Sequence, residues 1–463
     1  MSVVRRLPVV ADLTLVTAGA MTANIAGYLL QLLASRWLGV TGYSPFASLL
    51  AVQLLCAVPA LALQNVVARE IVRGAPLAAA RGLALRCAGL VAILALVLVP
   101  VVSAVLNVGL AASAAALCAA PVLVLLSGEQ GVLQGRSRFR ELAMVLGGAG
   151  IARVTPALIV LAAGGGTAPA LWAAAAGIAI AAAAARRAAD TTSVSTSSPA
   201  ATALPPQPLD PGGADPRPPL GSDAADLIGT PSDSQGAGGK SASNLSGRAR
   251  KYVGDVGVLP VFRAAQVQAA LMALSSADLL VSRIVLSEDE AGRYALGAIA
   301  AKIAFWLPQA VGVVLYPKMA QPQHSARAMR SALAVLVGVG ALGVLGAAVA
   351  APLAPLLAGQ DYAPVQGYLW LFALQGALLA VLQGALLSAI AADRTAPAAI
   401  TWIGLAMGVT VMLISAHSVL TLITIATATA ALTTLVISVI ALRTARTGNE
   451  SAATVPDSGP DGT

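Results

Sequence analysis

The sequence is poor in charged residues and in histidine. Only 10% of its 463 residues are charged, whereas a soluble globular domain carries about 25%. Hydrophobic residues make up 58% of the chain, and the mean hydropathy is +0.83. The two histidines, His324 and His417, are far apart in the sequence, so no histidine cluster is available for catalysis. These shortages exclude an ordinary soluble enzyme and predict an all-α polytopic membrane protein.

Cysteine is also scarce, and the usual nucleotide and metal motifs are missing. Cys56, Cys87 and Cys118 form no CxxC pair and have no neighbouring histidine pair, which argues against a disulfide framework or a metal site. No P-loop or glycine-rich nucleotide motif occurs. The acidic run at 288–290 is typical of a solvated turn and helix start. We therefore expect no enzyme activity, no catalytic residue, no cofactor and no metal.

Twelve segments are long and apolar enough to cross a bilayer, because a helix needs roughly 20 such residues to span the hydrocarbon core. They are residues 13–35, 45–68, 87–107, 112–133, 142–163, 169–185, 262–284, 294–316, 331–353, 365–389, 397–416 and 419–442.

The basic residues orient these spans. With a cytoplasmic N-terminus, the connections on the cytoplasmic side hold most of the 28 Lys and Arg residues, as the positive-inside rule requires. Only Arg36, Arg283 and Arg293 fall on the outer side. The net charge of +8 thus reflects topology, and we expect no nucleic-acid partner. The expected location is the inner (plasma) membrane, with many passes and with both termini in the cytoplasm.

One cytoplasmic connection differs from the others in composition. Residues 188–250 are rich in Ser, Thr, Pro and Gly and too poor in apolar residues to fold, which predicts a disordered linker. The linker separates an N-terminal six-helix lobe, 1–187, from a C-terminal six-helix lobe, 251–447. Residues 448–463 are predicted to be a disordered tail.

The two lobes begin alike, which indicates a duplication. The first lobe has SRWLGVTGYSPFA followed by Pro59 and Arg69, and the second has SRIVLSEDEAGRYA followed by Pro308 and Lys318. The spacing from proline to cation is the same in both copies. Because both copies start on the same side, the predicted repeat is parallel, and the lobes should be pseudo-symmetric. Pro59 and Pro308 interrupt equivalent helices, so we interpret both as hinges.

Three charged side chains lie well inside predicted spans, away from their ends, where each costs about 2.5–3.5 kcal/mol on insertion scales. They are Lys302, Arg153 and Asp278, and Asp278 aligns with Gln31 of the first lobe. A structural ion pair within the bundle would explain them. Alternatively, they line a cationic lumen that binds an anionic head group, because arginine contacts phosphate in bidentate fashion. Arg36, at the outer end of the first span, would then lie at the exit.

Several of these stretches resemble a known family. LLASRWLG, GVLQGRSRF, SSADLLVSR and GAIAAKIAFWLP are similar to the Wzx-like polysaccharide flippases of the multidrug/oligosaccharidyl-lipid/polysaccharide (MOP) exporter superfamily. The resemblance covers both lobes and excludes the linker and the tail. It implies two six-helix lobes around a central cavity that works by alternating access. Arg36, Asp278 and Lys302 match polar positions of the family pattern, whereas Arg153 matches none.

The leading hypothesis is a flippase that moves a saccharide, linked to a polyprenyl phosphate or diphosphate, from the cytoplasmic to the outer leaflet. The substrate-binding residues would be Lys302, Arg153, Arg36 and Asp278. Its partners would be the lipid-linked saccharide and membrane lipid, and the linker could bind glycan-assembly enzymes. Two alternatives stay open: a multidrug or cation antiporter of the same superfamily, and a non-transporting scaffold of an envelope-synthesis complex.

Overall fold

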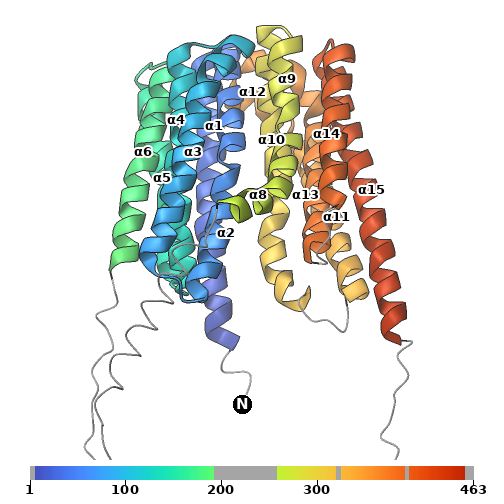
Figure 1. Ribbon diagram of the computed structural model, residues 1–463. Helices are drawn as coiled ribbons and strands as arrows, with labels where there is room; N and C mark the ends of the chain where they lie inside the picture. Colours follow the sequence, from blue (N-terminus) through green and yellow to red (C-terminus); the bar gives the residue numbers. More distant parts are fainter. Residues whose placement is uncertain (1–5, 192–257, 320–324, 392–395, 454–463) are drawn as a thin grey trace, which may run out of the picture. The chain divides into compact units, whose positions relative to one another are not determined.

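The computed structural model describes residues 6–191, 258–319, 325–391 and 396–453, and in these ranges the chain forms helices and no strand (Figure 1). The helices are α1 (Arg6–Cys56), α2 (Val58–Val72), α3 (Leu77–Val105), α4 (Leu110–Gly135), α5 (Phe139–Ala162), α6 (Thr167–Asp190), α8 (Leu259–Leu274), α9 (Ala277–Val285), α10 (Glu288–Met319), α11 (Ser325–Ala350), α12 (Leu353–Ala358), η2 (Gln360–Tyr368), α13 (Leu369–Ala391), α14 (Ala396–Ser415) and α15 (Val419–Ala453).

All twelve predicted spans fall on these helices, so the predicted all-α membrane fold is confirmed. Nine helical segments of the described chain are long and apolar enough to cross a membrane. The first, Thr14–Val72, covers two predicted spans. The two predicted spans outside these nine correspond to α10 and to α14, which contains the shorter apolar segment Ala399–Ser415.

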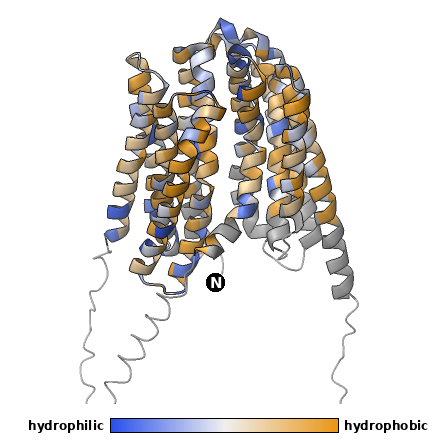
Figure 2. Cartoon of the chain, turned by 45° about the horizontal axis from the view of Figure 1, so that its top comes forward, coloured by the Kyte–Doolittle hydropathy of each residue, from blue (hydrophilic) through white to orange (hydrophobic). Residues whose placement is uncertain are grey.

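Apolar side chains cover the outside of the bundle as well as its core. Large hydrophobic residues are exposed along α3 and α11, for example Leu96 at 75% and Val349 at 81%. Figure 2 shows hydrophobic residues along the length of the helices and hydrophilic ones mainly toward their ends. A surface of this kind is solvated by lipid, because exposed apolar patches of such extent are rare in water-soluble monomers.

The domain predictions lie partly outside the described residues. Most of the predicted linker falls in 192–257, and most of the predicted tail in 454–463, which the structure does not describe. At the boundaries, α6 continues to Asp190 and α15 continues to Ala453, a few residues beyond the predicted ends of the lobes.

Two spans are broken inside the bundle. The second span consists of the end of α1 and of α2, which meet at Ala57, directly before Val58 and Pro59. The seventh span consists of α8 and α9, which meet at Ser275 and Ser276. In Figure 1, α8 lies across the space between the helices of the two lobes, and α9 continues upright. By contrast, α10 runs through position 308 as one helix. Of the two prolines interpreted as hinges, Pro59 therefore lies beside a break and Pro308 does not.

Equivalent helices pair in equivalent ways in the two lobes. In the first lobe, α4 packs against α2 and α3, and in the second lobe α13 packs against α10 and α11. These are the same span pairings, second with fourth and third with fourth, in each copy. The pairings therefore agree with the pseudo-symmetry that the repeated stretches predict.

We call the end of the bundle at which α1 begins the near end and the opposite end the far end. The near end holds the connections after α2 and α4 and the last turn of α6, and the far end holds Gly39, Asn107 and Gly359. Gly39 has a φ of 67°, which is a left-handed conformation that favours glycine, and it turns the chain from the first span into the second.

Candidate functional site

Three charged side chains of the described residues lie deep within spans, and they gather between the lobes. Arg153 is in the middle of α5, Asp278 is in α9, and Lys302 is in the middle of α10. Lys302 interacts electrostatically with both of the others, with attraction to Asp278 and repulsion from Arg153. We call these three residues, with the neutral side chains bonded to them, the central cluster. The structure thus brings together three of the four predicted substrate-binding residues.

Asp278 is held by two neutral donors of the second lobe. The Tyr294 hydroxyl donates to Asp278 Oδ2 at 2.7 Å, and Gln375 Nε2 donates to the same oxygen at 3.0 Å. Asp278 is buried, with 3% exposure, and its Oδ1 has no hydrogen-bond partner among the described residues. The carbonyl oxygen of Gln375 is likewise buried and unpaired. The site therefore has two open acceptors beside a fixed carboxylate.

The break in the seventh span explains how a carboxylate is tolerated there. Because α9 begins after Ser276, Asp278 occupies its first turn. The N-terminus of a helix carries a partial positive charge from its aligned peptide dipoles, which stabilises an acidic side chain. A discontinuous helix thus offsets, inside the bundle, part of the cost of burying the Asp278 carboxyl.

Close helix contact places the two donors. Gly376 of α13 packs directly against the Ala301 carbonyl of α10, and a Cβ at Gly376 would overlap that oxygen. One residue away, Gln375 reaches Asp278. The Tyr294 ring lies edge-on to the Phe372 ring, with centroids 4.9 Å apart and an interplanar angle of 68°. The interface between α10 and α13 therefore fixes both groups that bind the carboxylate.

The first lobe contributes Arg153 and two neutral groups. Arg153 Nη2 donates to Gln53 Oε1 at 3.2 Å, while Arg153 Nε is buried without a partner. The Tyr28 hydroxyl donates across the lobes to the Lys302 carbonyl at 3.2 Å. The central cluster therefore spans both lobes, with an open donor on the first and open acceptors on the second.

Arg36, the fourth predicted substrate-binding residue, lies apart from the central cluster. It is exposed in α1 at the far end of the bundle, three residues before the turn at Gly39. Its Nη1 donates to the carbonyls of Leu356 at 3.1 Å and Leu357 at 3.4 Å. These carbonyls belong to the last turn of α12, in the second lobe. Arg36 therefore caps a helix of the opposite lobe.

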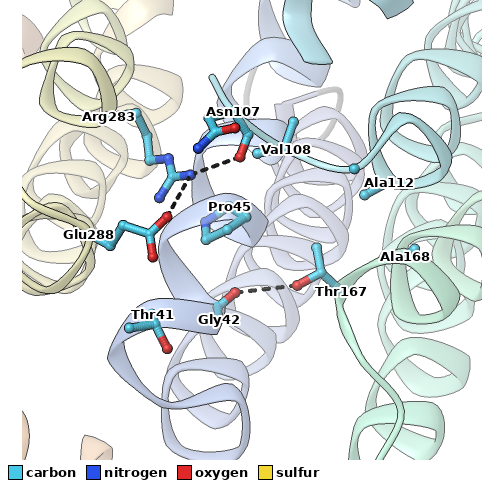
Figure 3. Close-up of a pocket in the computed structure, with 11 residues that line it drawn as sticks. Thr41, Gly42, Pro45, Asn107, Val108, Ala112, Thr167, Ala168, Arg283 and Glu288 are labelled. Carbon is cyan, nitrogen blue, oxygen red and sulfur yellow. Dashed lines mark hydrogen bonds and ion pairs between the residues drawn. The ribbon is translucent and has the colours of Figure 1, made fainter. Parts of the chain in front are cut away.

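Arg283, which we did not predict as a site residue, makes the reciprocal contact. Its Nη2 donates to the carbonyls of Leu106 at 3.0 Å and Asn107 at 3.2 Å, which follow α3 in the first lobe. Its Nη1 donates to Ser44 Oγ at 3.3 Å. The Glu288 carboxylate lies 3.9 Å from the guanidinium, as Figure 3 shows. We call the contacts of Arg36 and Arg283 together the far-end seam.

A pocket of about 430 Å³ lies beside the far-end seam, lined by Thr41, Gly42, Pro45, Asn107, Val108, Gly109, Ala112, Thr167, Ala168, Arg283 and Glu288 (Figure 3). None of the central cluster lines this pocket. Within the pocket the guanidinium of Arg283 already bonds to the protein, so the pocket has no open cationic donor that would bind an anion.

One further buried carboxylate of the described residues is Glu129 of α4. Two nitrogens of the Arg81 guanidinium donate to its carboxylate, Nε to Oε1 at 2.8 Å and Nη2 to Oε2 at 3.0 Å. The bidentate pair neutralises Glu129. Among the described residues, no group of three or more His, Cys, Asp and Glu side chains is placed to hold a metal ion.

The comparisons with known proteins agree on the fold. No family model matches the chain, and no characterised protein matches it in sequence. Among solved structures, the inward-facing conformation of a multidrug resistance MATE family transporter of the MOP superfamily is similar, with a TM-score of 0.54 and 13% identity over 96% of both chains.

Two further structures give the same result. The Vibrio cholerae MATE transporter VcmN in the bent form has a TM-score of 0.53 and 15% identity over 94% of this chain and 98% of that chain. A MATE transporter in the bent conformation has a TM-score of 0.52 and 11% identity over 96% and 97%. The chain therefore has the fold of a membrane transporter. More narrowly, that fold is the one seen in MATE transporters of the MOP superfamily.

Proposed function

We propose that the protein is an alternating-access flippase of the plasma membrane that moves a lipid-linked saccharide from the cytoplasmic to the outer leaflet. The near end, with its many arginines, would face the cytoplasm. The two lobes would open in turn to either side, while the lipid tail remains in the bilayer. The fold shared with transporters supports this proposal, and the central cluster suggests the chemistry of the substrate.

The observation that carries the proposal is the pair of cations in the central cluster. Lys302 and Arg153 lie between the lobes at mid-span and repel each other, and no carboxylate of the described residues forms a direct ion pair with either of them. Placing two cations in a low-dielectric interior is costly unless an anion joins them during function. A phosphate head group would provide that charge and would accept hydrogen bonds from both side chains.

Depletion of the protein in its host tests the proposal. We expect a lipid-linked saccharide to accumulate on the cytoplasmic face. Wild-type protein should clear it, whereas Lys302→Gln and Arg153→Gln at equal membrane levels should not. A suitable control is Arg73→Gln, because Arg73 has 60% side-chain exposure and pairs only with Glu70 at the near end. Failure of any lipid-linked saccharide to accumulate would exclude the flippase.

Asp278 favours a second candidate, an antiporter of drugs or cations. A buried carboxylate with an unpaired oxygen can bind a proton or a metal cation, and the exchange could drive export. The test is dye efflux from everted vesicles under an imposed proton or sodium gradient. Efflux that Asp278→Asn abolishes would support the antiporter, while gradient-independent dye levels would argue against it. The first lobe offers less for such coupling, since Arg81 already neutralises Glu129.

A further inference from the structure

Four of the five tryptophans lie near the ends of membrane spans, and the fifth, Trp306, lies in the middle of one. Trp37, Trp172, Trp370 and Trp402 are 43–46% exposed, as expected for the aromatic belts at the two membrane–water interfaces. Trp306 is instead at the centre of the predicted span 294–316 and is partly buried. An interfacial role therefore does not explain Trp306.

Trp306 lies on the face of α10 that is turned toward the first lobe. Gly292, Ile299 and Trp306 follow one another at intervals of seven residues, so they share one face of the helix. Gly292 packs directly against the Val40 carbonyl of α1, and a Cβ at Gly292 would overlap that oxygen. Ile299 is buried in the same core cluster as Val40. The stripe that ends at Trp306 is therefore the one that α10 presents to the first lobe.

Burial along this face ends at the level of Lys302. Residues 294–299 of α10 are all buried, whereas Lys302 and Trp306 are partly buried and Ile303 is 41% exposed. The first lobe changes in the same direction, since residues 14–29 of α1 include no buried residue and Leu30 is only 2% exposed. The two helices therefore pack tightly in their far-end halves and leave their near-end halves accessible. Trp306 lies where the accessible part begins.

Two neighbours determine what Trp306 can bind. Lys302 precedes it by four residues, so the ammonium and the indole are neighbours on the helix surface, with Cβ atoms about 5–6 Å apart. The buried Phe305 ring meets the indole edge-on, with centroids 5.3 Å apart and an interplanar angle of 76°. This contact fixes the orientation of the indole and leaves part of its surface accessible. Helix α10 thus presents a cation and a fixed aromatic surface side by side.

We propose that Trp306 is a stacking surface for a sugar ring of the transported saccharide, next to the phosphate that Lys302 binds. This inference rests on the proposed flippase function and adds a residue that determines its specificity. A pyranose ring carries its hydroxyls around its edge and presents C–H groups on its faces. Such a face packs against an indole and buries apolar area on both partners. The stacking does not involve charge, so it selects for the saccharide equally with one phosphate or with two.

Binding to the protein in proteoliposomes tests the inference, with the lipid-linked saccharide that accumulates on depletion and the same lipid phosphate after removal of the saccharide. We expect Trp306→Leu to lower the affinity for the glycosylated lipid about tenfold and to leave the affinity for the bare lipid phosphate unchanged. Trp306→Phe keeps an aromatic face and should stay within about threefold of wild type. The matched control is Trp172→Leu, near the far end of α6, which should bind both lipids as wild type does. Equal losses for both lipids, or no loss for either, would overturn the inference.

Fluorescence provides a second test in which Trp306 itself is kept. In a variant with Trp37→Phe, Trp172→Phe, Trp370→Phe and Trp402→Phe, tryptophan emission comes from Trp306 alone. We expect the glycosylated lipid to shift or quench this emission and the bare lipid phosphate to leave it unchanged. The same response to both lipids, or no response, would refute stacking and leave the flippase function intact. Failure of any lipid-linked saccharide to accumulate on depletion would instead exclude the flippase and, with it, this inference.

Discussion

The far-end seam and the central cluster join the same two lobes in different ways. In the seam, equivalent residues make equivalent contacts. Arg36 and Arg283 each donate to backbone carbonyls that follow the third span of the opposite lobe, α11 for Arg36 and α3 for Arg283. The preceding serines also match, since Ser35 and Ser282 each bond to the carbonyl three residues earlier. In the central cluster the symmetry is lost, because the first-lobe stretch around Leu54 that aligns with Lys302 has no cation, and Asp278 aligns with the neutral Gln31.

The difference between these regions separates two tasks. Contacts repeated around a pseudo-two-fold axis hold both lobes equally and must break together when the far end opens. Unequal contacts define a directional site that presents donors from one lobe and acceptors from the other. We therefore expect substitutions in the seam to change the balance between closed and open states, and substitutions in the central cluster to change stability and substrate.

Asp278→Ala should have the largest effect on stability. It leaves the Tyr294 hydroxyl and the Gln375 amide buried without their acceptor, at roughly 1–3 kcal/mol for each group. We expect about 3 kcal/mol of destabilisation, measured by unfolding in mixed detergent. Gln31→Ala is the control at the equivalent position of the first lobe, where the side chain makes only a 3.5 Å bond to the Gly27 carbonyl. Equal losses in both variants would contradict the asymmetry of the lobes.

Arg283→Gln should shift the conformational equilibrium toward a far-end-open state. Its guanidinium has only 4% side-chain exposure and bonds to two carbonyls and a hydroxyl of the first lobe. Charged hydrogen bonds contribute about 1.5–3 kcal/mol, so the open population should rise about tenfold or more. The measurement is labelling of a Val40→Cys reporter, a buried position that packs against Gly292 of the second lobe, by an impermeant maleimide in a background without native cysteines.

Arg36→Gln should act in the same direction with a smaller effect. Arg36 makes two carbonyl contacts of 3.1 and 3.4 Å, but it is exposed, and water replaces lost bonds more easily there. We expect a labelling increase of about two- to fivefold at the same reporter. If Arg36→Gln left labelling unchanged, and the double variant labelled no faster than Arg283→Gln, Arg36 would not hold the seam closed.

The sequence was sufficient to predict the helices and to single out three charged residues that the fold brings together. Charges within apolar spans stand out because they are costly there, and three such residues proved to be neighbours. Their neutral partners, among them Tyr294, Gln375 and Gln53, carry no such signal, since polar uncharged residues in spans are common. The contact between Arg283 and Leu106 joins positions 177 residues apart, so only the packing of the lobes could reveal it.

The break in the seventh span was missed for a related reason. Hydropathy averaged over about 20 residues cannot detect a two-residue interruption. The local signal was present in ALSSADLL, where Ser276 precedes the helix and an acidic residue follows in its first turn. In contrast, both prolines were visible in the sequence, yet the helix is broken beside Pro59 and continuous at 308.

Tyr28→Phe and Tyr294→Phe should give the smallest effects and should separate the two regions most finely. The Tyr28 hydroxyl bonds across the lobes to a helical carbonyl that also accepts within its own helix, so its loss should cost about 0.5–1 kcal/mol and increase lobe separation only two- to fourfold. The Tyr294 hydroxyl bonds within the second lobe to Asp278, so its loss should lower the unfolding free energy by about 1–2 kcal/mol without changing labelling at the far end. The paired measurements are maleimide labelling and unfolding of both variants. If Tyr294→Phe increased labelling as much as Tyr28→Phe, the central cluster would control opening, and the division of tasks between cluster and seam would fail.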